Sequence, residues 1–293
     1  MSNQTLQRAA DFLVAHQGED GYWRDYRVGP NGSRAEAWIT ACVGYTLTQI
    51  GSIRSFQPEI EKAANVLLAT RRADGWGYNR HTACDADTTA WVVRFLASID
   101  ALEGIDVVGT LGHYVTADGR VKTFQTANRF GRWAHEHDEV APMVGMALLS
   151  SGQYDWTQRI RQNVAAAPRW RPFWWRSYAY VCAQSLEFLA MSGGIADDVS
   201  HRETAILGRL EPPSSSFDVA TRMIASRHLG TNSDPTELTA MQASDGSWQP
   251  SIELLVPDQW QNITAEPQAD DQRLMSTSMA MLALANVWPS NRG

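Results

Sequence analysis

The feature that most constrains the fold of this chain is a pattern of paired helices that recurs along its length. Gly21 and Gly75, each in an Asp-Gly turn, are 54 residues apart, and Gly75 and Gly119 are 44 apart. A further such turn, at Gly246, lies 127 residues beyond Gly119, or three periods of roughly 42. In each unit an amphipathic segment precedes a more apolar one. The predicted pairs are 4–16 with 35–50, 57–70 with 90–97, 107–115 with 139–149, 156–166 with 178–191, 201–210 with 219–229, and 235–241 with 274–287.

Six such pairs predict an all-α protein, an (α/α)6 barrel formed by a single domain over residues 1–293. The apolar helices would form an inner ring and the amphipathic helices an outer one, with no strands beyond short turns. A linear solenoid is the alternative. It is disfavoured because the second helix of each pair is apolar nearly all round, which suits an inner ring. The Pro- and Ser-rich segment 211–216 resembles a linker, but the period continues through it.

Composition limits the partners and the compartment. A net charge of −7 argues against nucleic acid as the main partner. We find no apolar run near the roughly 20 residues that span a bilayer, and residues 1–17 lack a signal-peptide core. The three widely spaced cysteines, an odd number, predict no disulfide framework, so we expect a cytoplasmic protein. The 12 tryptophans leave aromatic side chains over for a binding surface.

The stretch 84–91 carries the most suggestive chemistry. Asp85 and Asp87 lie two residues apart, and Thr88, Thr89 and an apolar run follow. One interpretation is a helix cap, in which either aspartate accepts hydrogen bonds from backbone N–H groups. The other uses both acids: two neighbouring carboxyl groups do not both ionise readily, so one keeps its proton. A carboxylic acid that faces an apolar cavity can act as a general acid.

Two turns and this acidic stretch resemble a known family. Residues 17–23 and 242–248 both read Gln-x-x-x-Gly-x-Trp, which resembles the QW repeats of triterpene and squalene–hopene cyclases. Segment 71–77 is a degenerate copy, with Arg71 in the place of Gln and Gly77 in the place of Trp. Residues 85–90 resemble the Asp-x-Asp-Asp-Thr-Ala motif of squalene–hopene cyclases and class II diterpene cyclases. The resemblance is to one of the two barrel domains of those enzymes.

The resemblance implies a class II terpene cyclase, an isomerase or lyase that starts cyclisation of a linear isoprenoid or prenylated substrate by protonation. Asp87 would donate the proton and Asp85 would support it. Thr88 stands where the family has a third acid, so one acid-supporting contact changes character. No cofactor is implied, and Mg²⁺ would enter only with a diphosphate substrate. A homodimer stays open, because the familiar enzymes place the substrate between two barrels and this chain has the length of one.

Two sets of residues are candidates for assisting such an acid. His81, His135 or His137 could pair with the conjugate base as imidazolium, although a solvated loop residue is the favoured interpretation of any one of them. Aromatic faces stabilise cations, and aromatic residues near the starts of the inner helices should converge at one barrel mouth. They could instead pack between repeats. These candidates are Trp38, Trp91, Trp133, Phe173, Trp174, Trp175, Tyr178 and Phe217.

Three other functional classes fit parts of the pattern. Zinc-dependent prenyltransferases share the ring architecture, and His81, Cys84 and Asp85 are suitable ligand types, but their spacing is unlike a standard zinc site. A helical toroid that only binds a partner would use both aspartates as caps. Glycosidases and lyases with (α/α)6 barrels also use carboxylate pairs, though QW-like turns are not expected of them.

Overall fold

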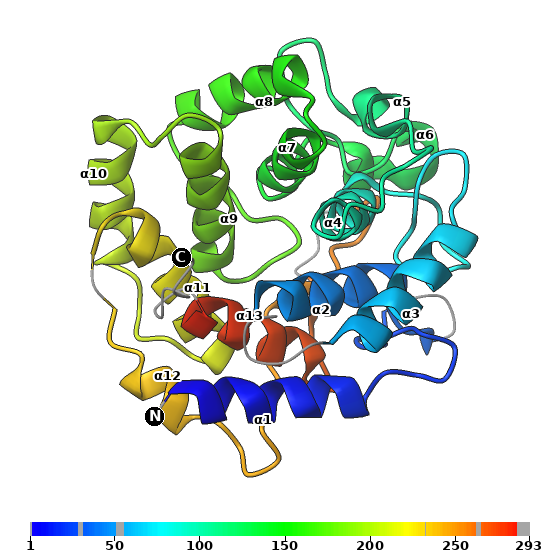
Figure 1. The fold of residues 1–293 in the computed structure, drawn as a ribbon. Helices are drawn as coiled ribbons and strands as arrows, with labels where there is room; N and C mark the ends of the chain where they lie inside the picture. The colour runs from blue at the N-terminus through cyan, green and yellow to red at the C-terminus, as the bar shows by residue number, and fades with distance from the viewer. Residues whose placement is uncertain (1, 29–31, 51–55, 232, 262–264, 286–293) are drawn as a thin grey trace.

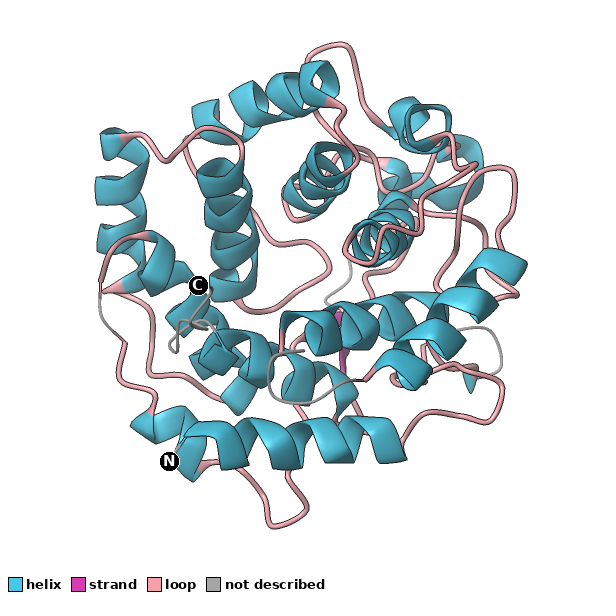
Figure 2. Cartoon of the chain, viewed as in Figure 1, coloured by secondary structure: helices cyan, strands magenta, loops and turns pink. Residues whose placement is uncertain are grey.

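The computed structural model describes residues 2–28, 32–50, 56–231, 233–261 and 265–285. Within these residues the regular secondary structure is almost wholly helical, and loops and turns connect the helices (Figure 2). Two short strands, β1 (Leu254–Leu255) and β2 (Pro267–Gln268), pair antiparallel with Leu254 opposite Gln268. The predicted all-α class is therefore confirmed.

The helices form two concentric rings (Figure 1). The inner ring consists of α2 (Ala37–Gln49), α4 (Ala86–Ala97), α7 (Val140–Ser150), α9 (Tyr178–Met191), α11 (Ser216–His228) and α13 (Leu274–Ala285). The outer helices are α1 (Ser2–Ala15), α3 (Gln57–Ala69), α5 (Val107–Leu111), α8 (Tyr154–Ala166), α10 (Asp197–Leu207) and α12 (Thr236–Ala240). Each inner helix packs against the next one, α13 closes the ring on α2, and α1 packs against α13. This closure confirms the barrel and excludes an open solenoid.

Three short helical segments accompany these twelve. They are α6 (Ala127–Phe130) and two 3-10 turns, η2 (Gly112–Tyr114) and η3 (Gly131–Ala134). Of them only η2 lies within a predicted helix, the segment 107–115. The last two of these in chain order, α6 and η3, lie in the long connection between α5 and α7. At three to four residues each, they are too short to show a hydrophobic period in the sequence.

Small residues let the inner helices pack closely. Every residue of α7 from Val140 to Leu148 is buried, because this helix has neighbours on several sides. A Cβ atom on Gly145 would lie 2.4 Å from the ring of Phe188 on α9. Gly44 on α2 faces the ring of Phe95 on α4 in the same way, with 2.7 Å available. Phenylalanine therefore fills the space that glycine leaves on the neighbouring helix.

Buried tryptophans connect the outer helices to the inner ones. The indole N–H of Trp23 donates to Leu13 O at the end of α1 (2.6 Å), and its backbone N–H donates to Thr40 Oγ1 on α2 (2.9 Å). Trp248 repeats both bonds, to Leu238 O (2.7 Å) and Thr277 Oγ1 (3.2 Å). Each indole thus satisfies a carbonyl that the end of an outer helix leaves unpaired.

The second turn departs from the alignment of the sequence motifs. Trp76, and not the residue at position 77, takes this role: it donates to Leu67 O (2.7 Å) and to Thr89 Oγ1 (3.0 Å). The assignment of Gly77 to the Trp position was therefore wrong by one residue. Sequence spacing does not resolve such a shift, because the fold conserves the position of the ring and not the number of turn residues.

The turn at residues 242–248 is hydrogen-bonded to α1. Gln242 Nε2 donates to Gly246 O and to Thr5 O on α1, both at 2.9 Å. Gly246 has φ +93°, and a Cβ atom there would lie 2.3 Å from Arg8 O, so only glycine fits this turn. Gln17 makes the corresponding bond to Glu59 O on α3.

These contacts predict a large stability difference between two tryptophans. Trp248 is fully buried, so Trp248→Ala should lower the free energy of unfolding by about 3–5 kcal/mol. The matched control is Trp260→Ala, because Trp260 is 62 % exposed and its loss should change stability by no more than about 0.5 kcal/mol. Urea denaturation of both variants measures the difference. Equal midpoints would show that the buried indole is not a structural element of the turn.

Candidate active site

Asp85 begins α4 and caps it. Its Oδ1 accepts a hydrogen bond from the backbone N–H of Thr88 at 2.7 Å, and its backbone is extended. Thr88 itself is buried. Burial raises the pKa of Asp85 to about 6, although the hydrogen bond from Thr88 opposes the shift. The capping interpretation therefore holds for Asp85.

Asp87 is not a cap. Its carboxyl group has no hydrogen-bond partner among the residues the structure describes. Its side chain is only half-buried, yet desolvation raises its pKa well above the usual range, and the carboxyl groups of Asp85 and Glu139 raise it further. The shift extends to higher pH the range over which the neutral acid is the favoured form of the group.

The face of α4 that carries Asp87 is turned to the interior of the ring. Asp87, Trp91 and Arg94 are four and three residues apart, so they share one face of the helix. Arg94 bonds to Tyr45 Oη on α2 at 2.8 Å and pairs with Glu187 on α9. Since α7 stands between α4 and α9 in the inner ring, Arg94 reaches Glu187 across the interior. Asp87 lies two turns nearer the helix start on the same face.

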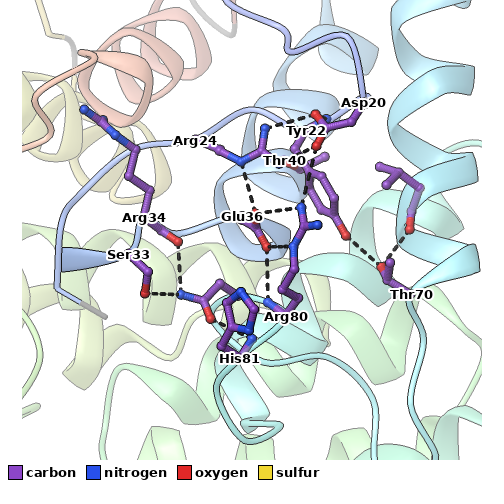
Figure 3. Close-up of polar contacts among 12 residues, drawn as sticks. Asp20, Tyr22, Arg24, Ser33, Arg34, Glu36, Thr40, Thr70, Arg80 and His81 are labelled. Atoms are coloured by element: carbon purple, nitrogen blue, oxygen red, sulfur yellow. Dashed lines mark hydrogen bonds and ion pairs between the residues drawn. The ribbon is translucent and has the colours of Figure 1, made fainter. Parts of the chain in front are cut away.

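The loop before α4 is tied to the start of α2 (Figure 3). Glu36, the residue before α2, receives two guanidinium hydrogen bonds from Arg80, at 2.8 and 2.9 Å, and one from Arg24 at 3.1 Å. The backbone N–H of Glu36 also donates to Tyr78 O (2.9 Å). On the other side, Ala86 N donates to Thr123 O (2.9 Å). The start of α4 is therefore braced from both neighbouring repeats.

One group of aromatic side chains lies between the starts of α4 and α7. Phe173 stacks on His137 with ring centroids 3.9 Å apart, and Trp174 meets Trp133 edge-on at 5.3 Å. Trp174 Nε1 donates to Thr123 Oγ1 at 3.3 Å, and the same hydroxyl lies 2.8 Å from His137 Nδ1. Three of the predicted aromatic residues and one predicted histidine thus form a single cluster, which we call the aromatic wall (Trp133, His137, Phe173 and Trp174).

A second aromatic group is centred on Trp175, the residue that follows Trp174. Trp175 stacks on Phe217 (5.1 Å) and on Tyr180 (4.1 Å), and meets Trp38 edge-on at 6.0 Å. These rings come from α2, α9, α11 and the loop before α9. Trp91 is buried on α4 and meets Tyr45 of α2 edge-on at 6.2 Å. The structure thus brings Trp38, Trp175 and Phe217 together, in a group other than the aromatic wall, and their convergence with the wall on one barrel mouth stays a prediction.

Other predicted residues lie elsewhere. Tyr178 donates its hydroxyl proton to Glu203 on the outer helix α10 (2.6 Å), because it is two residues, or about 200°, from the inward-facing Tyr180. His81 and His135 are exposed. His81 lies beside the ion-pair cluster of Glu36, Arg24 and Arg80, which we call the Glu36 cluster (Figure 3). His137 is buried, and burial lowers its pKa to about 3. Its ring is therefore neutral at physiological pH, contrary to the expected imidazolium.

Two residues of this region were missed at the level of sequence. Glu139 directly precedes α7, is 3 % exposed, and accepts hydrogen bonds from the backbone of the aromatic wall. Tyr180 is fully buried within the second aromatic group, and burial together with the Asp87 carboxyl raises its pKa well above the usual value. An acid at the start of an apolar helix, as at Asp85, was the signal that could have identified Glu139.

Two surface pockets are separate from this region. One of about 470 Å³ is lined by Arg27, Val28, Val256, Asp258, Ala265, Glu266 and Gln268. The other, of about 220 Å³, lies beside the Glu36 cluster and is lined by Tyr22, Glu36, Ala37, Thr70, Arg72, Trp76, Gly77, Asn79 and Arg80. Within the described ranges, no group of three or more His, Cys, Asp and Glu side chains is arranged to hold a metal ion. No helix there combines the length and apolar character needed to cross a membrane.

Comparison with known proteins identifies the fold. No protein-family model and no curated protein sequence matches the chain. Among solved structures, the apo form of type II terpene cyclase MstE from Scytonema superposes with a TM-score of 0.82 at 20 % identity, covering 97 % of both chains. A variant of MstE bound to geranylgeranyl dihydroxybenzoate, its substrate, gives 0.77 at 20 % identity over 96 % of both chains.

More distant structures share the same ring. The ent-copalyl diphosphate synthase from Streptomyces platensis gives a TM-score of 0.62 at 17 % identity over 85 % of this chain and 50 % of its own. An α-amylase from Clostridium perfringens gives 0.65 at 9 % identity over 98 % of this chain and 99 % of its own. The chain therefore has an all-α barrel fold like that of type II terpene cyclases, and the fold also occurs with other activities.

The raised pKa of Asp87 predicts a characteristic pH dependence. Because its pKa is higher in the folded than in the unfolded chain, Asp87 makes the free energy of unfolding fall as pH rises. Asp87→Asn removes this loss, so the Tm of the variant relative to the parent should increase as the pH rises above about 4, the usual pKa of an aspartate. Calorimetry over a pH series tests it, with the exposed Asp118→Asn as a contrast of opposite sign, because hydrogen bonds from Thr116 and Arg120 lower the pKa of Asp118. A relative Tm that falls with pH would mean that Asp87 is stabilised as the anion.

Proposed function

We propose that this chain catalyses proton-initiated, class II cyclisation of a linear isoprenoid or prenylated substrate, with Asp87 as the general acid. The observation that supports it most strongly is the state of Asp87: an inward-facing, desolvated carboxyl with no hydrogen-bond partner in the described structure. A structural carboxyl would be paired or bonded, as Asp85 and Glu36 are. Partial access combined with strong desolvation is what an acid facing an enclosed space would show.

The structural neighbours agree with this assignment. Two structures that match over the full length are of type II terpene cyclase MstE, one of them with geranylgeranyl dihydroxybenzoate bound as substrate. The α-amylase shows that the ring alone does not select the chemistry. The density of aromatic side chains around an unpaired acid favours cyclisation, because a carbohydrate hydrolase needs two accessible carboxyl groups, and Asp85 is engaged as a cap.

Each group has a definite part in the proposed reaction. The Asp87 O–H bond breaks as a C–H bond forms at the terminal alkene, and a carbocation results. The Asp85 carboxyl, supported by Thr88, keeps the proton on Asp87 until substrate arrives. Trp38, Trp91, Trp175 and Phe217 and the aromatic wall would present ring faces to the moving charge. Loss of a proton then ends the reaction, so the net change is isomerisation.

The substrate is an apolar isoprenoid chain, either free or attached to another group. We propose that no resident cofactor takes part, since a protonated carboxyl supplies the electrophile. Mg²⁺ would be needed only to accompany a diphosphate group. The competing hypotheses are the zinc prenyltransferase and the non-catalytic toroid. Both predict that the parent protein forms no cyclised isoprenoid product.

Asp87→Asn is the direct test. The amide keeps the shape but cannot donate a carboxylic proton, so cyclisation should fall by about 10²–10⁴-fold. Asp85→Asn is the matched control: asparagine also caps helices, so its effect should be milder. Both are incubated with geranylgeranyl dihydroxybenzoate and with linear isoprenoids in deuterated buffer. Deuterium should enter the initiating carbon with the parent only. Undiminished cyclisation by Asp87→Asn would refute the proposal.

A further inference from the structure

Glu139 is a buried acid that the proposed reaction does not yet use. It directly precedes α7, is 3 % exposed, and makes no capping bond to its own helix. Its Oε1 instead accepts the backbone N–H groups of Phe173 (2.7 Å) and Trp174 (2.5 Å). Its Oε2 is buried without a hydrogen-bond partner among the described residues. A carboxyl oxygen in this state is costly, so a role beyond folding is expected of it.

The two hydrogen bonds fix the backbone from which the aromatic wall projects. Phe173 stacks on His137 and Trp174 meets Trp133, so the peptide that Glu139 holds orients both rings. Trp175 follows immediately and reaches the second aromatic group. Asp138 holds the same loop one step earlier, through Arg171 N at 2.7 Å. Glu139 therefore sets the position of the aromatic side chains, while Asp138 anchors the loop at its outer part.

Glu139 also lies close enough to act on the acid. Helix α7 is the ring neighbour of α4, and Glu139 and Asp87 stand at the starts of these two helices. The charged and titratable groups that face Glu139 are Asp138 beside it, Asp87 on α4 and Tyr180 on α9. Among the residues that the structure describes, Glu139 forms no ion pair, and the Arg132 guanidinium lies over the Phe173 ring, 5.5 Å from its centroid. Burial raises the pKa of Glu139 to about 7, so its charge develops near neutral pH, and the ionised group opposes the ionisation of Asp87 in the same desolvated region.

We propose that Glu139 is a positioning residue that couples the proton donor to the aromatic wall: one oxygen holds the backbone at Phe173 and Trp174, and the negative charge of the ionised group favours the protonated form of Asp87. The catalytic consequence rests on the proposed function of Asp87. One side chain then contributes both to the positions of the cation-stabilising rings and, together with burial and Asp85, to the protonation of the acid.

The proposal has a definite pH signature. Loss of the Glu139 charge removes one of the causes that raise the pKa of Asp87, so Asp87 ionises at lower pH. Glu139→Gln keeps a carbonyl oxygen for the two N–H groups and removes the charge. Its Asp87 titration, and the alkaline fall of activity, should both move to lower pH by about one unit. Asp138→Asn is the matched control and should leave both where they are in the parent.

Infrared spectroscopy measures this without substrate. The C=O band of a protonated, buried carboxyl that disappears in Asp87→Asn is assigned to Asp87 and followed against pH in the parent, Glu139→Gln and Asp138→Asn. A shift to lower pH in Glu139→Gln alone supports the proposal. Coincident titrations of the parent and Glu139→Gln overturn it.

Turnover of geranylgeranyl dihydroxybenzoate tests the second half of the coupling. Glu139→Gln should yield the parent products, because the backbone bonds are kept, whereas Glu139→Ala should change the product ratio or abolish turnover. Parent products at the parent rate from Glu139→Ala overturn the positioning role. An active Asp87→Asn would refute the proposed function itself. An inactive Asp87→Asn with an unshifted Glu139→Gln titration refutes only the inference about Glu139.

Discussion

The barrel depends on one repeated contact, in which a buried indole joins the end of an outer helix to the side of an inner one. At Trp23, Trp76 and Trp248 the ring N–H bonds to the last turn of an outer helix and the backbone N–H bonds to a threonine hydroxyl. Both partners would otherwise be unsatisfied and buried, so each contact fixes the height and rotation of an inner helix. The Thr89 contact lies two residues after Asp87, so it also places the acid.

Once α4 is held in this way, the two aspartates differ only in direction. Asp85 turns back to the helix end and accepts the N–H of Thr88, whereas Asp87 points into the ring. Of the two interpretations that the sequence left open, the cap holds for Asp85, and the proposed acid is Asp87. The two carboxyl groups differ in their hydrogen bonds, which the sequence spacing does not reveal. A helix N-terminus favours the anion, but desolvation and nearby negative charge raise the pKa of Asp87.

The aromatic side chains are also positioned by hydrogen bonds that satisfy buried polar groups. The loop before α9 has backbone N–H groups that no helix or strand satisfies, and Glu139 and Asp138 accept three of them. The proposed coupling between Glu139 and Asp87 follows from this arrangement, because an acid used to hold a loop beside another acid acts on it electrostatically. The positions of the rings and the raised pKa of the proton donor would then both depend on where Glu139 is placed.

The sequence by itself determined the fold class, the number of helix pairs and the stretch that carries the acids. These follow from hydrophobic periodicity, from the Asp-Gly turns and from residue types, all of which act over short distances along the chain. The role of Trp76, the cap at Asp85 and the neutral state of His137 were decided by tertiary structure, because each depends on which groups lie nearby in space. The outward turn of Tyr178 and the meeting of Glu139 with Asp87 belong to the same class. They arise from packing between helices, which brings together residues 25 positions apart in the first case and 52 in the second and sets their solvation, a property that no local pattern encodes.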